Sequence, residues 1–431
     1  MTNLEEYLGG RIFNLRDLDS DTISTLLMYG AKIYSATYQE DKQVYCRRCL
    51  MPISETKYCR NCINLGKINT DDRLLITPSG LKFPVQSQYL KWDGKLTTNQ
   101  ETGVRELTEA FKKHRDHLVW AVTGAGKTEM TFPLIEQALK NQQRIAICSP
   151  RVDVCIELFP RLQKVFPNTS IGLFHGQSLE KYHLTQISVM TVHQLIRFEK
   201  AFDVLIVDEV DSYPLAGSLM LHKAIKKAKK ETGMITYLSA TPPQELISEV
   251  QNKKISLTKL YQRFHGHPLP EPRCHLLFKK IDFLGINPRL KFHLQQAFKN
   301  HRVMLFFPSI PEMLVFSKKL HREFPNLTFV TVSSKDPQRL EKVQKFRERQ
   351  VQVILTTTIL ERGVTFKKIM VIVLNADAKE FSKTSLIQIA GRAGRGKDSF
   401  DDEVHFYYCY YNLQIKQACA EINSLNQQVK K

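Results

Sequence analysis

The sequence predicts an α/β protein in which two parallel sheets, each wound with helices, follow a small four-cysteine module. From about residue 96 onward, short runs rich in β-branched residues alternate with longer amphipathic stretches, which is typical of a helix-wound parallel sheet. The strand segments are apolar throughout instead of alternating, which indicates burial on both faces. Four of the nine cysteines cluster ahead of these strands, at positions 46, 49, 59 and 62.

The predicted strands form two series, separated by the Pro- and His-rich segment 262–274, which we interpret as a linker. The first series includes LVWAV (118–122), RIAICS (144–149), ISVMT (187–191), DVLIVDE (203–209) and MITYLSAT (234–241); the second includes RVMLFFPS (302–309), LTFVTVSS (327–334), VQVILTTT (351–358) and IMVIVLN (369–375). We therefore expect an N-terminal region (1–95) with its cysteine module at about 44–64, a first lobe (96–270) and a second lobe (271–431).

Composition favours a globular protein with a polyanionic partner. The 431 residues carry a net charge of +19, and the basic residues are spread along the chain, so nucleic acid fits better than a membrane surface. Positive charge that serves only solubility remains an alternative. The acidic N-terminus MTNLEEYLGG and the lack of a long apolar run predict a cytosolic protein that reaches a membrane only through a partner.

The segment AVTGAGKT (121–128) follows a predicted strand and precedes a predicted helix, a setting that binds phosphate. It matches the phosphate loop GxxxxGK[ST] except that Ala121 replaces the first glycine. The nucleotide contacts are expected from Thr123, Gly124, Ala125, Gly126, Lys127 and Thr128. The glycines permit close backbone approach, Lys127 would contact the β and γ phosphates, and Thr128 would hold Mg²⁺.

Acidic and basic residues that complete a site for ATP hydrolysis occur further along the chain. Asp208, at the end of DVLIVDEVD, would bind Mg²⁺, and Glu209 would polarise the attacking water. In QIAGRAGRG (388–396), Arg392 and Arg395 can present guanidinium groups to the γ phosphate. Taken alone, the last segment could equally be a basic turn without a ligand.

The ordered set LTTNQ (96–100), AVTGAGKT, SPRVDV (149–154), DEVD (208–211), SAT (239–241), TTTILERGVTF (356–366) and QIAGRAGR (388–395) resembles the superfamily 2 helicases and translocases. The resemblance covers roughly three quarters of the chain. It implies two RecA-like lobes and a DNA-dependent ATPase, and it accounts for Ala121, because the first motif of that superfamily commonly begins with alanine.

The same resemblance assigns roles position by position. Gln100 would read adenine. Lys127, Thr128, Asp208 and Glu209 would form the hydrolytic core, Ser239 and Thr241 would couple hydrolysis to movement, Gly363 and Thr365 would join nucleotide and strand contacts, and Gln388, Arg392 and Arg395 would sense the γ phosphate. Capping of a strand end by the hydroxyls of Ser239 and Thr241 is the alternative for those two residues.

The cysteine pattern C-x2-C-x9-C-x2-C predicts a structural zinc site formed by Cys46, Cys49, Cys59 and Cys62. Redox chemistry and unpaired thiols are the alternatives, and a closed shell of four thiolates is not expected to be catalytic. Basic and aromatic residues lie among the cysteines and suit a single DNA strand, although the tyrosines could equally pack the module. In HKAIKKAKKE (222–231) we expect Ala224, Ile225 and Ala228 to form the apolar stripe and the five lysines to face solvent, with a track for DNA as the alternative.

An N-terminal four-cysteine module, followed by LTxxQ and a compact two-lobe motor, resembles the ComFA family of late competence proteins. The motor motifs are also similar to those of PriA, which instead inserts its zinc module between the lobes. The ComFA resemblance implies an ATP-driven translocase that imports transforming single-stranded DNA, with ComFC and the channel ComEC as partners at the inner face of the membrane. A repair or replication-restart helicase and a non-catalytic zinc-containing DNA-binding adaptor are the alternatives. The sequence leaves homo-oligomerisation open.

Overall fold

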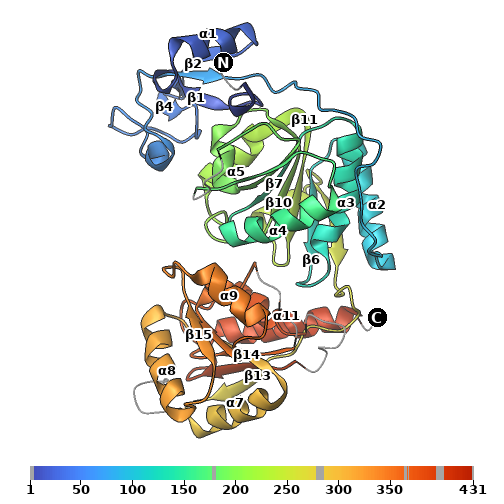
Figure 1. Cartoon of the computed structure of the whole chain (residues 1–431), viewed down its shortest axis with the longest axis vertical. Helices are drawn as coiled ribbons and strands as arrows, with labels where there is room; N and C mark the ends of the chain where they lie inside the picture. The colour runs from blue at the N-terminus through green and yellow to red at the C-terminus, as the bar shows by residue number, and fades with distance from the viewer. Residues whose placement is uncertain are drawn as a thin grey trace. The chain divides into compact units, whose positions relative to one another are not determined.

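A computed structural model of the chain describes residues 4–176, 181–277, 286–363, 366, 368–394 and 402–429. The chain divides into two compact units, which are described separately (Figure 1). The first comprises residues 1–121 and 127–259, and the second comprises residues 122–126 and 260–431. The short loop 122–126 therefore belongs to the second unit although both its neighbours in the chain belong to the first.

The first unit contains a seven-stranded sheet in the order β12-β6-β11-β10-β7-β9-β8, and the pairs from β6 to β8 are parallel. The strands are β6 (His117–Ala121), β7 (Ile145–Ser149), β8 (Ile171–Phe174), β9 (Ile187–Thr191), β10 (Phe202–Asp208), β11 (Lys229–Ser239) and β12 (Ser256–Leu260). The helices are α2 (Thr98–Lys112), α3 (Lys127–Lys140), α4 (Val152–Val165), α5 (Leu219–Ala228) and α6 (Gln244–Gln251), and a 3-10 turn, η4, spans Val192–Arg197.

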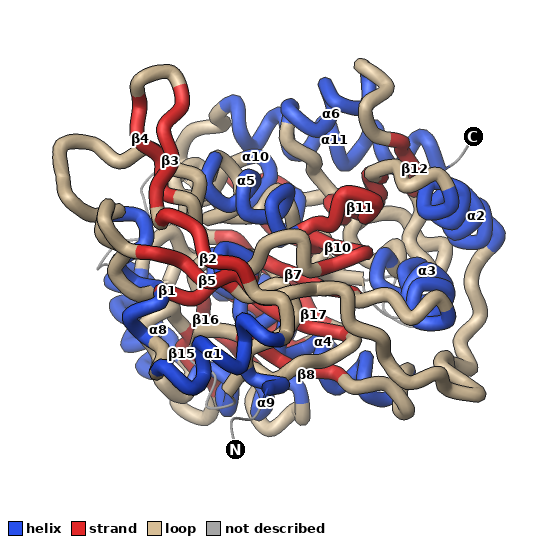
Figure 2. Tube along the Cα trace, turned by 90° about the horizontal axis from the view of Figure 1, so that it is seen from above, coloured by secondary structure: helices blue, strands red, loops and turns tan. Residues whose placement is uncertain are grey.

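The N-terminal region belongs to the first unit and packs against the rest of it through a shared core. Its antiparallel sheet β1-β5-β2 and hairpin β3-β4 lie next to α5 (Figures 1 and 2). The elements are η1 (Leu4–Glu6), β1 (Ile12–Asn14), η2 (Leu15–Asp17), α1 (Ser20–Met28), β2 (Lys32–Ser35), β3 (Thr37–Glu40), β4 (Gln43–Cys46), η3 (Arg60–Leu65) and β5 (Arg73–Ile76). The four cysteines belong to the same hydrophobic cluster as Ile196, Ala224 and Ile225, so the module is part of this unit's core.

The second unit contains a six-stranded, fully parallel sheet in the order β13-β18-β17-β14-β16-β15. The strands are β13 (Arg273–Leu276), β14 (Arg302–Phe306), β15 (Phe329–Val332), β16 (Val353–Thr356), β17 (Ile369–Val373) and β18 (Val404–Tyr408). The helices are α7 (Pro288–Asn300), α8 (Ile310–Glu323), α9 (Arg339–Arg347), α10 (Lys383–Ala390) and α11 (Leu413–Val429), and a 3-10 turn, η5, spans Thr358–Leu360.

The predicted fold class is confirmed, because both strand series form parallel sheets and the four cysteines form one buried cluster. The prediction for the lysine run is wrong in part. Ala224, Ile225 and Ala228 are buried as expected, but the helix ends at Ala228 and Lys229 begins strand β11. Among the helices that the structure describes, none has the length and apolar composition of a bilayer-spanning segment.

Candidate functional site

The phosphate loop connects the end of β6 to the first residue of α3. Gly124 and Gly126 have φ values of 81° and 75°, in the left-handed region that glycine adopts without strain. Ala121 is fully buried as the last residue of β6, so this position belongs to the strand and not to the loop. The absence of a glycine there is therefore structurally unremarkable.

Lys127 opens α3, and its Nζ donates a hydrogen bond to the carbonyl oxygen of Ala121 at 2.9 Å. The ammonium group is therefore held back against the strand from which the loop departs. Thr128 follows in the first turn of the helix, where backbone N–H groups and the helix dipole favour an anion. This end of α3 has the elements that the sequence predicts for phosphate binding.

The acidic motif DEVD begins at the carboxyl end of β10, in the middle of the same parallel sheet. Asp208 is the last residue of the strand, and its Oδ1 accepts a hydrogen bond from the backbone N–H of Glu209 at 2.8 Å. Glu209 has a φ of 53°, which turns the chain sharply after the strand. Because the carboxyl ends of parallel strands meet at one edge of a sheet, Asp208 lies at the edge where ligands of such folds bind.

Asp211, to which the sequence analysis gave no role, connects two of the predicted motifs. Its Oδ1 accepts from Ser239 Oγ at 2.7 Å and its Oδ2 accepts from Thr241 Oγ1 at 2.6 Å. Ser239 Oγ also accepts from the backbone N–H of Thr241 at 3.0 Å. The hydroxyls of SAT thus bind the last carboxylate of DEVD. The sequence signal for this contact was that the fourth residue of DEVD, Asp211, is acidic and lies only three positions after Asp208.

In the second unit, Gln388 and Arg392 are both almost completely buried. Arg392 Nε donates to the carbonyl oxygen of Glu361 at 2.8 Å, which connects GRAG to the motif containing Gly363. Gly363 has a φ of 71° and ends the described part of that turn. Two predicted site residues, Thr365 and Arg395, lie outside the described residues.

Arg263 was interpreted as part of a linker, but its guanidinium group is buried and saturated with backbone acceptors. Nε donates to Thr123 O at 3.2 Å, Nη2 to Gly391 O at 2.9 Å, and Nη1 to Ala393 O at 3.0 Å and to Gly394 O at 2.5 Å. Burial lowers the pKa of Arg263 to about 10, which leaves it charged at neutral pH. One side chain therefore fixes the phosphate loop and the GRAG turn within the second unit.

Close backbone approach also explains Gly391. A Cβ at this position would lie 2.0 Å from Thr123 Oγ1 and 2.8 Å from Thr123 Cβ, so any larger residue would displace the loop. The sequence signal for this contact was the glycine itself, but its partner, about 270 residues earlier in the chain, could not be read from the motif.

Gln100 lies at the start of α2, where it closes a capping box with Thr97. Its Oε1 accepts from the N–H of Thr97 at 2.8 Å, and Thr97 Oγ1 accepts from the N–H of Gln100 at 3.3 Å. The side chain of Gln100 therefore serves as a helix cap in this structure. The predicted role of Gln100 as adenine reader stays a prediction.

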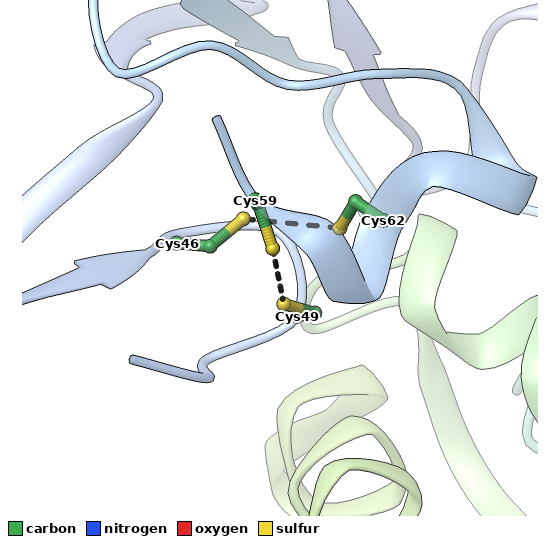
Figure 3. Close-up of side chains that lie close together, drawn as sticks. All are labelled: Cys46, Cys49, Cys59 and Cys62. Atoms are coloured by element: carbon green, nitrogen blue, oxygen red, sulfur yellow. Dashed lines mark hydrogen bonds between the residues drawn. The ribbon is translucent and has the colours of Figure 1, made fainter. Parts of the chain in front are cut away.

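The four cysteines are buried and turn their sulfur atoms toward one another (Figure 3). Cys46 Sγ lies 3.8 Å from Cys62 Sγ, and Cys49 Sγ lies 3.5 Å from Cys59 Sγ. A tetrahedral zinc site with Zn–S bonds of about 2.3 Å places its sulfurs about 3.8 Å apart, whereas a disulfide would require about 2.05 Å. The donor set and its spacing therefore fit zinc.

Cationic side chains near the cysteine cluster donate hydrogen bonds to buried backbone carbonyl oxygens. Arg48 is buried and its Nη2 donates to Cys62 O at 3.2 Å and also to Gly66 O. From α5, Lys223 Nζ donates to Leu50 O at 3.0 Å, and Lys227 Nζ donates to the carbonyl oxygens of Arg48 and Ile196. These bonds, which the sequence analysis missed, hold the module against α5.

The remaining lysines of the run are paired with carboxylates in the first unit. Lys229 binds Asp116 at 3.1 Å and Lys230 binds Asp203 at 2.8 Å, while Lys226 is exposed 3.5 Å from Glu249. The expectation of five solvent-facing lysines is therefore wrong, because backbone carbonyls of the module and carboxylates of the sheet attract them. The helical pattern showed the apolar stripe but not these distant partners.

Comparison with known proteins places the chain among helicases. Residues 93–244 match the family "Type III restriction enzyme, res subunit", and residues 289–397 match "Helicase conserved C-terminal domain". The protein "Competence protein ComFA" of Streptococcus pneumoniae is 38% identical over 98% of this chain and 98% of its own length. Its namesake from Bacillus subtilis is 38% identical over 86% of this chain and 80% of its own length.

Solved structures show the same fold at low identity. Mss116p bound to single-stranded RNA and AMP-PNP has a TM-score of 0.59 and 15% identity, covering 78% of this chain and 80% of its own. RecG bound to a three-way DNA junction has a TM-score of 0.55 and 17% identity, covering 78% of this chain and 45% of its own. These neighbours support the two-lobed helicase architecture.

Proposed function

Because the chain belongs to the ComFA family and is a DNA-dependent ATPase of helicase superfamily 2, we propose that it is a single-stranded DNA translocase that imports transforming DNA during natural competence. One observation carries this proposal: the match to a competence protein extends over 98% of both chains. It therefore includes the cysteine module as well as both lobes, whereas the matches to "Transcription-repair-coupling factor" and "ATP-dependent DNA helicase RecG" cover only 32% and 47% of those proteins.

In this proposal the loop residues 123–128 bind the phosphates of ATP, and Lys127 stabilises charge on the β and γ phosphates. Thr128 and Asp208 would hold Mg²⁺, which neutralises phosphate charge when bound. Glu209 orients the attacking water. Asp211, held by the hydroxyls of Ser239 and Thr241, positions the turn that carries Asp208 and Glu209.

Gln388, Arg392 and Arg395 are proposed to sense the γ phosphate, Gly363 and Thr365 to connect nucleotide with strand contacts, and Gln100 to read adenine. The four cysteines would hold a structural zinc ion, consistent with their sulfur spacing. We further propose, from family membership, that ComFC and ComEC are partners and that the protein works at the inner face of the cell membrane.

ATP hydrolysis by the purified protein, measured at one salt concentration with single-stranded DNA, duplex DNA and RNA, tests the motor. We expect the largest stimulation with single-stranded DNA. Displacement of streptavidin from the end of a biotinylated single strand then separates translocation from duplex unwinding. If the protein unwound a forked duplex as fast as it displaced streptavidin, the result would favour a repair or restart helicase. DNA binding without any hydrolysis would favour the adaptor.

A further inference from the structure

Three histidines from distant parts of the second unit meet on one face of its sheet. His275 lies on β13, His405 on the neighbouring strand β18, and His293 on α7. One ring nitrogen from each lies within 4.8 Å of the others. The ring centroids of His293 and His405 are 4.6 Å apart, and those of His275 and His405 are 5.1 Å apart.

These three histidines are far apart in the sequence, and it is the fold that brings their rings together. In the parallel pair β13-β18, Arg273 lies opposite His405 and His275 lies opposite Tyr407. Because side chains alternate along a strand, His275, His405 and Tyr407 share one face of the sheet. Leu290 and Leu294 of α7 are buried in the core that includes Tyr407, and His293 follows Leu290 by almost one helical turn. The helix therefore presents His293 toward the two strand histidines.

We propose that His275, His293 and His405 bind a zinc ion through one ring nitrogen each. Three imidazoles are a ligand set that zinc accepts, with a fourth position left for water. Zn–N bonds of about 2.0 to 2.1 Å in a tetrahedral site place the nitrogens about 3.3 Å apart. The distance from His275 Nε2 to His405 Nδ1 is 2.8 Å and the three nitrogens lie within 4.8 Å of one another, so the rings must shift to bring all three nitrogens to this spacing.

Neighbouring side chains orient two of the rings as the outer shell of a metal site does. His405 Nε2 lies 3.0 Å from Glu403 Oε2, and donation of this proton leaves the lone pair of Nδ1 facing His275. Glu403 is itself fixed by an ion pair between its Oε1 and Arg273 Nη1 at 2.5 Å. The hydroxyl of Tyr407 forms a hydrogen bond with Nδ1 of His293, which leaves Nε2 of that ring for a metal.

A zinc ion at this position would tie α7 to the edge of the sheet. β13 is the terminal strand of the sheet and pairs only with β18 among the described strands. His275 is half-buried and His405 almost completely buried, so an ion would have solvent on one side and core on the other. The alternative is a metal-free network in which the imidazoles hydrogen-bond to one another. These two possibilities differ in zinc stoichiometry.

The test compares zinc content by mass spectrometry in the full-length wild type, His293→Ala and His321→Ala after dialysis against Zn²⁺ and removal of loosely bound ion. His321 is an exposed histidine on α8 of the same unit and serves as the matched control. We expect His293→Ala to hold about one zinc ion per chain fewer than the other two proteins, because two imidazoles bind zinc weakly. Equal zinc content in all three would overturn the proposal.

Two further measurements keep the test independent of the cysteine site and of misfolding. Co²⁺ loaded in place of zinc gives intense thiolate charge-transfer absorption at the cysteine site, whereas imidazole ligands give only weak bands. The wild type should therefore bind about one Co²⁺ per chain beyond the amount that saturates the thiolate absorption. Binding that stops at thiolate saturation would rule out the histidine site. His293→Gln, with circular dichroism as a folding control, replaces the alanine variant if that protein fails to fold.

Discussion

The phosphate loop and the four-cysteine module are both short segments recognisable in the sequence, but they keep their shapes by different means. The loop takes its shape from the backbone, with Gly124 and Gly126 at positive φ and with buried β6 on one side and α3 on the other. The module contains only the hairpin β3-β4 and η3 around its cysteines. We therefore expect that the chemical groups of the loop can be removed without loss of fold, whereas loss of a cysteine thiol should also weaken the fold of the module.

Replacement of Lys127 by alanine separates chemistry from fold and has the largest expected effect. ATP turnover should fall by about 100-fold or more, because a charged donor to the phosphates is lost. The melting temperature should stay close to that of the wild type, since the loop keeps its glycines and both flanking elements. The measurements are DNA-stimulated ATP hydrolysis and thermal unfolding.

Lys140→Ala, at the other end of the same helix, is the matched control, because the side chain of Lys140 is exposed and pairs with Glu136 of its own helix. It should retain wild-type turnover. Normal hydrolysis by Lys127→Ala would remove the phosphate loop from the proposed active site.

Cys46→Ser should lower stability more than ATP turnover, which is the reverse of the result expected for Lys127→Ala. Loss of one ligand should release about one zinc ion per chain and destabilise the module by about 3 kcal/mol or more, because metal binding and folding are coupled. Basal hydrolysis should fall far less than in Lys127→Ala. Zinc content, limited proteolysis and ATPase assays measure the three effects. Cys409→Ser, outside the cluster, should retain zinc. If Cys46→Ser held as much zinc as the wild type, the cysteines would not be the ligands.

The contrast between the two regions also explains what could be predicted from sequence. The phosphate loop, DEVD and the cysteine pairs are local patterns, because the chemistry requires particular residues a few positions apart. Arg263 and Lys227 could not be assigned in this way. Their partners are backbone carbonyls, which any residue type provides. Gly391, one of the partners of Arg263, is also more than 100 residues away from it in the sequence.

Four strands of the two large sheets, β8, β12, β13 and β18, were likewise not identified from the pattern; two of these, β13 and β18, lie in the second unit. Both carry histidine within short segments, so their apolar signal is weak, and β13 begins inside the segment interpreted as a linker. The histidine cluster depends on these strands and on α7, so it could not be recognised before the fold was known. The sheets themselves could be predicted, because their central strands are apolar on both faces.

The expected effect of Arg263→Ala lies between those of Lys127→Ala and Cys46→Ser, because this residue supports the phosphate loop through hydrogen bonds to the backbone. Its removal takes away hydrogen bonds to four buried backbone carbonyl groups, and we expect a loss of about 2 to 3 kcal/mol in unfolding free energy. ATP turnover should fall by about tenfold as the loop loses its anchor. Arg263→Lys should recover only part of both quantities, because one ammonium group cannot reach all four acceptors.

Arg322→Ala is the control for Arg263, since Arg322 is exposed on α8 of the same unit. It should change neither quantity. Loss of stability in Arg263→Ala with wild-type turnover would show that the arginine supports the fold alone, and that the phosphate loop keeps its shape without it.

The smallest expected effect concerns Lys227, which holds the cysteine module to α5. Lys227→Met keeps the aliphatic stem but removes the donors to Arg48 O and Ile196 O, so at neutral pH the unfolding free energy should fall by about 1 to 2 kcal/mol. Lys226→Met, on the exposed side of the same helix, should cost less than about 0.5 kcal/mol. Urea unfolding of the wild type and both variants measures these differences.

The pH dependence of this difference tests whether burial of the charge is the cause. Burial lowers the pKa of Lys227 to about 8, with partial compensation by Glu199. Between this value and the ordinary lysine pKa of about 10.4, the unfolded chain binds the proton that the folded chain has released, so stability rises with pH. The advantage of the wild type over Lys227→Met should therefore grow by about 1 to 2 kcal/mol from about pH 7 to about pH 10. A constant difference over this range would mean that Lys227 is solvated and does not attach the module to α5 through a buried charge.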